Sequence, residues 1–152
     1  MLNRLTGVFS AFQEHEVRYL VVGGIAAVLY GVPRATFDLD IFIDATIENA
    51  SRLLQALNSQ GFGTASMTTA EDLAAHEITI FNDRVRIDVL TRLPGVPFTE
   101  AWQRRVKMDY QGQVFIVAAR DDLIASKRAA GRPVDLEDVR LLELPGPEAS
   151  IE

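Results

Sequence analysis

The stretch VGGIAAVLYGVPRATFDLDIFID, residues 22–44, decides the fold. Its last part, from Asp38 to Asp44, alternates with a period of two and predicts a strand. Because successive side chains on a strand point to opposite faces, Asp38 and Asp40 share one face. The apolar residues between and after them face the core. The strand therefore presents two carboxylates side by side.

A short apolar run, Arg18 to Val22, precedes Gly23-Gly24 and predicts a buried strand. Ile25 to Tyr30 predicts a short helix, which stops at Gly31-Val32-Pro33. Glycines at this position let the backbone turn sharply and let a ligand approach the main chain. The free N–H groups at the helix start favour a phosphate. The competing interpretation is that the glycines serve the geometry of the turn only.

A second acidic strand is predicted further along the chain. The β-branched runs Ile78 to Phe81 and Val85 to Leu90 are joined by Asn82-Asp83 and predict a β-hairpin. The alternation places Arg84, Arg86 and Asp88 on one face of its second strand, where the arginines could simply offset the charge of the aspartate. If this strand lies beside the strand of Asp38 and Asp40, three carboxylates converge on one face of a sheet.

The rest of the chain alternates between helix and strand patterns. We expect helices at 2–12, 47–60, 98–106, 121–130 and 135–144, and a strand at 113–117. Arg104, Arg105 and Lys107 are interpreted as the charged end of the helix expected at 98–106. The fold class is α/β (α+β), a small mixed β-sheet with helices packed on it. We expect one domain over 1–144 and a flexible tail over 145–152.

Composition narrows the function classes. The 152 residues include no cysteine and two histidines, which leaves no thiol chemistry and little material for a histidine metal cage or a Ser-His-Asp triad. The net charge of −6 argues against broad binding of nucleic acid but leaves room for a local basic groove. No apolar run approaches the roughly 18 residues of a membrane span, and Met1 to Gln13 does not resemble a secretory signal. We expect a cytoplasmic protein without a membrane partner.

Three close carboxylates need a counter-charge. Two unit charges 4 Å apart repel by about 4 kcal/mol at an effective dielectric constant of 20. Protonation, basic partners or divalent cations relieve that repulsion, and hard oxygen ligands favour Mg²⁺ or Mn²⁺. The alternative is that the acids only line a solvated strand, as we expect for Asp44.

The order of these motifs resembles the nucleotidyltransferase superfamily that shares the DNA polymerase β-like palm. That signature is a hydrophobic residue with Gly-Gly or Gly-Ser, a short helix, Asp-x-Asp, and a third acid on a later strand. The resemblance implies that Asp38, Asp40 and Asp88 are catalytic and bind metal, and that Gly23 and Gly24 bind the nucleotide. The matching segments are Val22-Gly23-Gly24, Asp38-Leu39-Asp40 and Arg86-Ile87-Asp88.

LIASK at 123–127 and RPVDLED at 132–138 are similar to motifs of one branch of this superfamily. That branch includes the nucleotidyltransferase-like toxins of type IV toxin–antitoxin systems and their small relatives. The resemblance implies that Lys127 contacts the triphosphate, against the alternative of a solvated helix lysine. The chain departs from the pattern at Ile25, where many active members have serine or threonine, and at Val134, where lysine is common.

Other polar residues near these motifs carry weaker expectations. Arg34 and Thr36 precede the acidic pair by a few residues and are interpreted as binding phosphate or holding the loop. Arg132 is interpreted as a substrate contact or as a structural clasp with Asp135 or Asp138. Tyr30, Phe42 and Trp102 are candidates for base stacking, although aromatic side chains more often serve packing.

The function implied is metal-dependent transfer of a nucleoside monophosphate from a nucleoside triphosphate to an acceptor hydroxyl, with release of pyrophosphate. The acceptor stays open between a tRNA end, a partner protein and a small hydroxylated molecule. The short chain favours an RNA or a protein that brings its own docking surface. One alternative is an antitoxin-like or regulatory binding module with weak catalysis. Ile25 favours it, because many active members have serine or threonine at that position. The other is a purely structural α/β protein.

Overall fold

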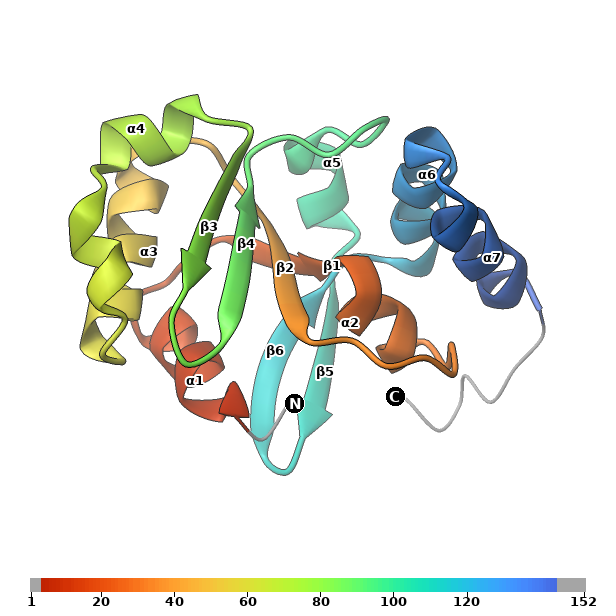
Figure 1. Cartoon of the computed structure of the whole chain (residues 1–152), viewed down its shortest axis with the longest axis horizontal. Coiled ribbons are helices and arrows are strands. Elements are labelled where there is room, and N and C mark those ends of the chain that lie inside the picture. The colour runs from red at the N-terminus through yellow and green to blue at the C-terminus, as the bar shows by residue number, and fades with distance from the viewer. Residues whose placement is uncertain (1–3, 145–152) are drawn as a thin grey trace.

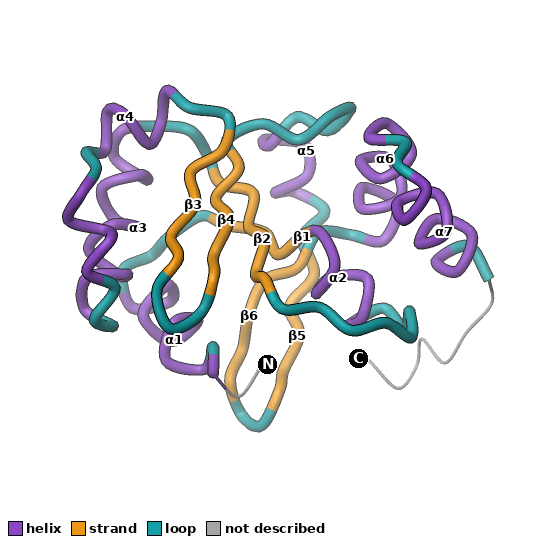
Figure 2. Tube along the Cα trace, viewed as in Figure 1, coloured by secondary structure: helices purple, strands orange, loops and turns teal. Residues whose placement is uncertain are grey.

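The computed structural model describes residues 4–144, so the tail expected over 145–152 lies outside the described residues. Six strands form one mixed sheet in the order β3-β4-β2-β1-β6-β5 (Figure 2). This sheet, with helices packed on it, confirms the predicted fold class. The strands are β1 Tyr19–Val22, β2 Asp38–Ile43, β3 Ile78–Asn82, β4 Arg86–Leu90, β5 Val106–Tyr110 and β6 Gln113–Val117.

Seven α-helices and a short 3-10 helix at Gly63–Met67 surround the sheet in the described part of the chain. The pair α6–α7 lies at one end of the molecule, and α3 and α4 lie at the other (Figure 1). None of the helices in residues 4–144 is long and apolar enough to cross a membrane. The helices are α1 Thr6–Glu14, α2 Gly23–Leu29, α3 Ile47–Ser59, α4 Ala70–Ala75, α5 Phe98–Gln103, α6 Arg120–Ala130 and α7 Pro133–Leu142.

The two faces of the sheet differ in chemistry. On one face the apolar side chains of β2 are buried, and Phe9 of α1 stacks on Phe115 of β6 with ring centroids 4.9 Å apart. On the other face Phe42 meets Phe98 of α5 edge to face at 5.2 Å. Asp38 and Asp40 lie on this second face, since they alternate with the core residues of β2. Part of that face is therefore packed and part carries acids.

Register places the two acidic strands together. Strands β2 and β4 pair in parallel, with Asp40 opposite Asp88 and Asp38 opposite Arg86. Strand β1 runs antiparallel to β2, and its last residue, Val22, lies opposite Asp40. The glycines that follow Val22 therefore begin beside the acidic pair. They form the first turn of α2 rather than a separate linker.

The sequence prediction is wrong in the region 98–110. The predicted helix ends at Gln103, and Lys107 lies on β5 rather than at a helix end. Strands β5 and β6 form a hairpin, in which buried Met108 lies opposite buried Phe115. Its turn has positive φ at two successive residues, Gln111 and Gly112. Burial of alternate residues therefore overrides the continuation of the helix.

Smaller differences lie in the other connections. The predicted hairpin of β3 and β4 is confirmed, but Asn82 still pairs with Arg86, so the turn is formed by residues 83–85. The 3-10 helix and α4 were not predicted. Helix α4 begins at a capped residue, because the Thr69 side chain accepts a hydrogen bond from the backbone N–H of Asp72 at 3.1 Å.

Candidate active site

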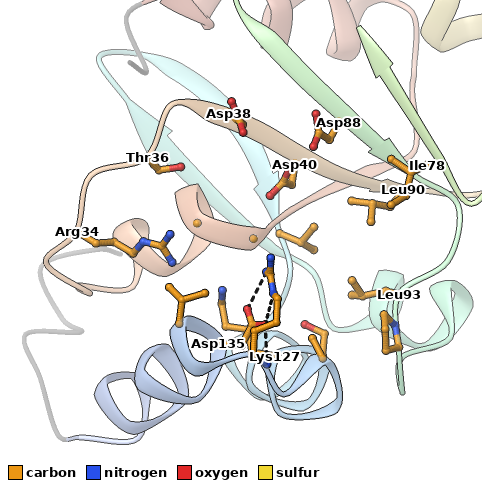
Figure 3. A pocket seen from close by; sticks show the side chains of 18 of the residues that line it. Arg34, Thr36, Asp38, Asp40, Ile78, Asp88, Leu90, Leu93, Lys127 and Asp135 are labelled. Atoms are coloured by element: carbon orange, nitrogen blue, oxygen red, sulfur yellow. Dashed lines mark hydrogen bonds and ion pairs between the residues drawn. The ribbon is translucent and has the colours of Figure 1, made fainter. Parts of the chain in front are cut away.

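A cavity of about 510 Å³ opens between the acidic face of the sheet and the pair α6–α7. The three aspartates of β2 and β4 lie on one side of it, and Lys127 and Asp135 face them from the two helices (Figure 3). Arg34 and Thr36 lie at one end. Packed hydrophobic side chains do not fill this hollow, so the predicted acidic face opens into space for a ligand.

The three carboxylates line this cavity together. Their side chains differ in exposure: 44% for Asp38 and 17% for Asp88, while Asp40 is half-buried. The pKa of Asp40 is raised from 3.8 to about 6, first by burial and then by the negative charges of Asp88 and Asp38. Lys127 and Arg86 act against this shift. Asp40 is thus the acid that most needs a positive charge nearby.

Arg86 is the resident counter-ion of the acids. Its Nε donates to Asp88 Oδ1 at 2.8 Å and its Nη2 to Asp88 Oδ2 at 3.2 Å, while Nε lies 3.8 Å from Asp38 Oδ2. Arg84 does not share this role, contrary to the prediction. Its guanidinium donates to the backbone oxygen of Gln60 and lies 4.8 Å from the ring of Phe62.

The carboxylates of Asp38, Asp40 and Asp88 suit a hard divalent cation if Arg86 no longer occupies them. As the side chains stand, no group of three or more His, Asp or Glu residues within 4–144 is arranged to hold a metal ion. The carboxylates nevertheless line one open cavity, and the pKa of Asp40 is raised by burial and by the neighbouring negative charges, both of which a bound cation would offset. Carboxylate oxygens are ligands that Mg²⁺ and Mn²⁺ prefer. The residues therefore fit the ion, with Arg86 as its competitor.

Gly23 has a structural reason to be glycine. Its φ is +70°, and a Cβ at this position would lie 2.1 Å from Asp40 Oδ2. Gly24 is crowded from another side, because its Cβ would lie 2.8 Å from Thr36 Oγ1. The geometric interpretation of the glycines therefore holds, while both residues also line the cavity. Their nucleotide-binding role stays a prediction.

Ile25 is buried in the core at 2% exposure and contributes no polar group to the cavity. The hydroxyl beside the glycine turn comes instead from Thr36, which also lines the cavity. The loop from α2 to β2 is what brings Thr36 back against Gly24.

A buried carboxylate holds two cations of the cavity wall. Asp138 Oδ2 accepts from Lys127 Nζ at 2.9 Å and from Arg34 Nη1 at 2.6 Å. The side chain of Lys127 is only 6% exposed, so the alternative of a solvated helix lysine is wrong. Sequence reasoning considered Asp138 only as a partner of Arg132. Asp138 lies on α7 and Lys127 on the preceding helix, α6, so no local sequence pattern indicates their contact.

Arg132 forms the predicted clasp, and its partner is Asp135. Its Nε donates to Asp135 Oδ2 at 2.7 Å and its Nη2 to Asp135 Oδ1 at 3.1 Å. Asp135 also accepts from the backbone N–H of Arg132, which closes a capping box at the start of α7. Both residues line the cavity, so the clasp fixes the wall opposite the acids.

The other end of the cavity is apolar, and the sequence did not predict it as part of the site. Figure 3 shows Ile78 and Leu90, at the end of the β3–β4 hairpin, with Leu93 beyond them. Pro94, which follows Leu93, extends this lining. The cavity thus has a charged end and an apolar end, which suits a ligand that has both parts.

Comparisons with known proteins agree with this architecture. A family model described as "Nucleotidyltransferase of unknown function (DUF6036)" matches residues 3–146. No curated protein matches the chain in sequence. A crystal structure of a protein from Thermotoga maritima, described as a "putative nucleotidyltransferase", has a similar fold. The TM-score is 0.61 at 14% sequence identity, over 92% of this chain and 90% of that chain.

Proposed function

Since the chain belongs to the DUF6036 family of nucleotidyltransferases, we propose that it transfers a nucleoside monophosphate from a nucleoside triphosphate to an acceptor hydroxyl. The observation that carries this proposal is the pairing of Asp40 with Asp88 across β2 and β4, above an open cavity with cations on its far wall. With acids on one wall and cations on the opposite wall, the cavity can bind the metal ion and the phosphates of a metal–triphosphate complex at the same time.

Each part of the cavity has a task in this proposal. Asp38, Asp40 and Asp88 would hold Mg²⁺ or Mn²⁺, which when bound supplies positive charge to the phosphates and to the attacking oxygen. Lys127 and Arg34 bind phosphate oxygens, and Asp138 keeps both cations in place. The apolar end at Ile78 and Leu93 receives an uncharged part of a substrate.

The reaction is one displacement at phosphorus. The acceptor oxygen forms a bond to the α-phosphorus, and the bond from that phosphorus to its bridging oxygen breaks. Pyrophosphate leaves with the electron pair of that bond, and Asp88 takes the proton of the hydroxyl. Arg86 must first release at least one oxygen of Asp88, because it now donates to both. Catalysis then rests on positioning and on charge stabilisation.

The direct test uses the full chain with each α-labelled nucleoside triphosphate, Mn²⁺ or Mg²⁺, and a cell extract as the source of acceptor. We expect label on a macromolecule and release of pyrophosphate. Asp40→Asn should abolish labelling. Asp44→Asn should not, because Asp44 pairs with Arg18 at 3.1 Å outside the cavity. Equal labelling by wild type and Asp40→Asn, or no labelling with any nucleotide, contradicts the proposal.

A binding module with weak catalysis is the second candidate, as in an antitoxin or a regulator of a toxin–antitoxin pair. The observation in its favour is the double hydrogen bond that keeps Asp88 occupied by Arg86. The two candidates differ in their response to Mn²⁺, which electron paramagnetic resonance follows directly. Stoichiometric Mn²⁺ binding that Asp40→Asn removes favours the enzyme. A tight protein complex that forms without metal or nucleotide favours the module.

A further inference from the structure

A second cavity of about 420 Å³ lies away from the acids, at the start of β1. It is formed where the end of α1 and the end of α5 meet the β5–β6 hairpin, and it contains the chain's single tryptophan, Trp102. Four cations line it: Arg18, Arg52, Arg105 and Lys107. Glu16 is the one acid in the lining. This is a strong local excess of positive charge in a chain whose net charge is −6.

Two of these cations have no acidic partner among residues 4–144. The side chain of Lys107 makes no hydrogen bond or ion pair there, and the guanidinium of Arg105 donates only to the backbone oxygen of Trp102, at 2.8 Å. The other two form exposed ion pairs, Arg18 with Asp44 at 3.1 Å and Arg52 with Glu48 at 2.7 Å. Exposed pairs of this kind contribute little stability and exchange partners readily. The cavity therefore offers its positive charge to an anion.

The indole of Trp102 is fixed in a stack. Phe98 lies nearly parallel to it, at 19° and 5.7 Å, while the guanidinium carbons of Arg105 and Arg18 lie 4.2 and 5.4 Å from its ring centre. Planar guanidinium and aromatic groups are the surfaces on which unpaired bases stack. Val114 and Ile116 add an apolar floor. Charge alone would suit any polyanion, but the stack selects one that carries flat rings.

We propose that this second cavity binds a segment of single-stranded RNA, with phosphates on Arg105 and Lys107 and a base stacked at Trp102. The cations come from three different segments of the chain, which suits several phosphates in a row rather than one. A duplex keeps its bases stacked on each other, so a single strand fits the stack better. This binding is separate from the transfer reaction proposed above and stands without it.

Trp102 makes the test direct, because all tryptophan fluorescence reports on this cavity. We would titrate the full chain with a mixed-sequence 12-nucleotide RNA at about 0.1 M salt and follow the quenching. Each phosphate contact contributes about 0.7 to the salt slope of single-strand binding. The double variant Arg105→Gln with Lys107→Gln should therefore bind on the order of tenfold more weakly or worse. Glu16→Gln, which removes the one acid, should bind several-fold more tightly.

The matched control is Arg128→Gln with Arg140→Gln, which changes the net charge equally but alters exposed pairs on α6 and α7. It should bind RNA as wild type does, and so should Asp40→Asn, which separates this test from that of the transfer reaction. Equal binding by the Arg105→Gln/Lys107→Gln variant overturns the proposal. Equal quenching by polyglutamate, or by adenosine monophosphate at the same nucleotide concentration, overturns it as well.

Discussion

Gly23 and Asp40 are so close that a methyl group on the first would overlap the carboxylate of the second. A Cβ on Gly23 would lie 2.1 Å from Oδ2 and 2.9 Å from Cγ of Asp40. The carboxylate is the movable end of a side chain, so it would rotate away while the strand stays paired. The first turn of α2 thereby sets the direction of the most strongly perturbed acid of the cavity.

We therefore expect Gly23→Ala to lose divalent-cation binding while the chain still folds. Alanine at positive φ costs on the order of 1 kcal/mol of unfolding free energy. Gly112→Ala is the matched control, because Gly112 has φ +83° and no atom within 4 Å of its Cβ position. Urea denaturation should show similar losses for both variants. Mn²⁺ titration should show a large loss for Gly23→Ala alone, and unchanged binding by that variant would contradict the expected displacement.

Asp40→Asn should stabilise the chain at neutral pH in the absence of metal. The folded-state pKa of Asp40 is about 6, above the ordinary 3.8, so the folded chain keeps a proton that the unfolded chain loses first. The stability of the wild type therefore falls as pH rises from about 4 to about 6. A shift of this size corresponds to roughly 2–3 kcal/mol.

Thermal unfolding at several pH values measures this effect. The melting temperature of Asp40→Asn should exceed that of the wild type at pH 7, and the two should agree at pH 4. A difference that is the same at both pH values would show that ionisation of Asp40 is not its cause.

Arg86→Gln should strengthen binding of Mn²⁺ to the metal-free protein. The arginine donates to both oxygens of Asp88 and lies 3.8 Å from Asp38, so its loss frees both acids and removes a competing positive charge. Isothermal titration calorimetry measures the change, which we expect to be several-fold in affinity. Arg84→Gln serves as the control, because Arg84 points to Gln60 and Phe62 instead. Weaker binding by Arg86→Gln would mean that this arginine supports the cation site rather than competing for it.

Loss of Asp138 on α7 should lower the free energy of unfolding more than loss of Lys127, its buried ion-pair partner on α6. Asp138→Asn leaves Lys127, which is 6% exposed, without the one carboxylate that forms an ion pair with it within the described residues. Removing one member of a buried ion pair costs roughly 3–5 kcal/mol. Lys127→Met should cost less, since Asp138 keeps its 2.6 Å contact with Arg34. Denaturant unfolding of the two variants checks the order, and a larger cost for Lys127→Met would reverse this account.

The acidic face could be predicted because strand alternation is a local property. Leu39, Ile41 and Ile87 alternate with the acids, and that pattern alone assigns Asp38, Asp40 and Asp88 to the face away from the core. The pairing of β2 with β4 could not be derived from this alternation. It depends on which strand lies beside which, a relation between segments far apart in the chain.

Most of the other parts were missed because their cause is not local, and α4 is the exception. Strand β5 follows directly on a helix, and the turn at Gln111-Gly112 lacks the Asn-Gly or Asp-Gly signal of a tight hairpin. Helix α4 did carry a local signal, since Thr69-Ala70-Glu71-Asp72 has the spacing of a helix cap. The contact of Asp138 with Lys127 and Arg34 depends on how α7 packs against α6 and on the path of the loop before β2.

The two walls of the first cavity come from different stretches of the chain. Its three sheet aspartates, Asp38, Asp40 and Asp88, all precede residue 90, whereas Lys127 and Arg132 belong to the segment after residue 120. A lineage can therefore change the positive groups that a substrate meets by altering two short helices, while the strands keep the acids in register. New substrate preferences in related chains should accordingly arise from replacements in that helical segment, with the sheet inherited almost intact.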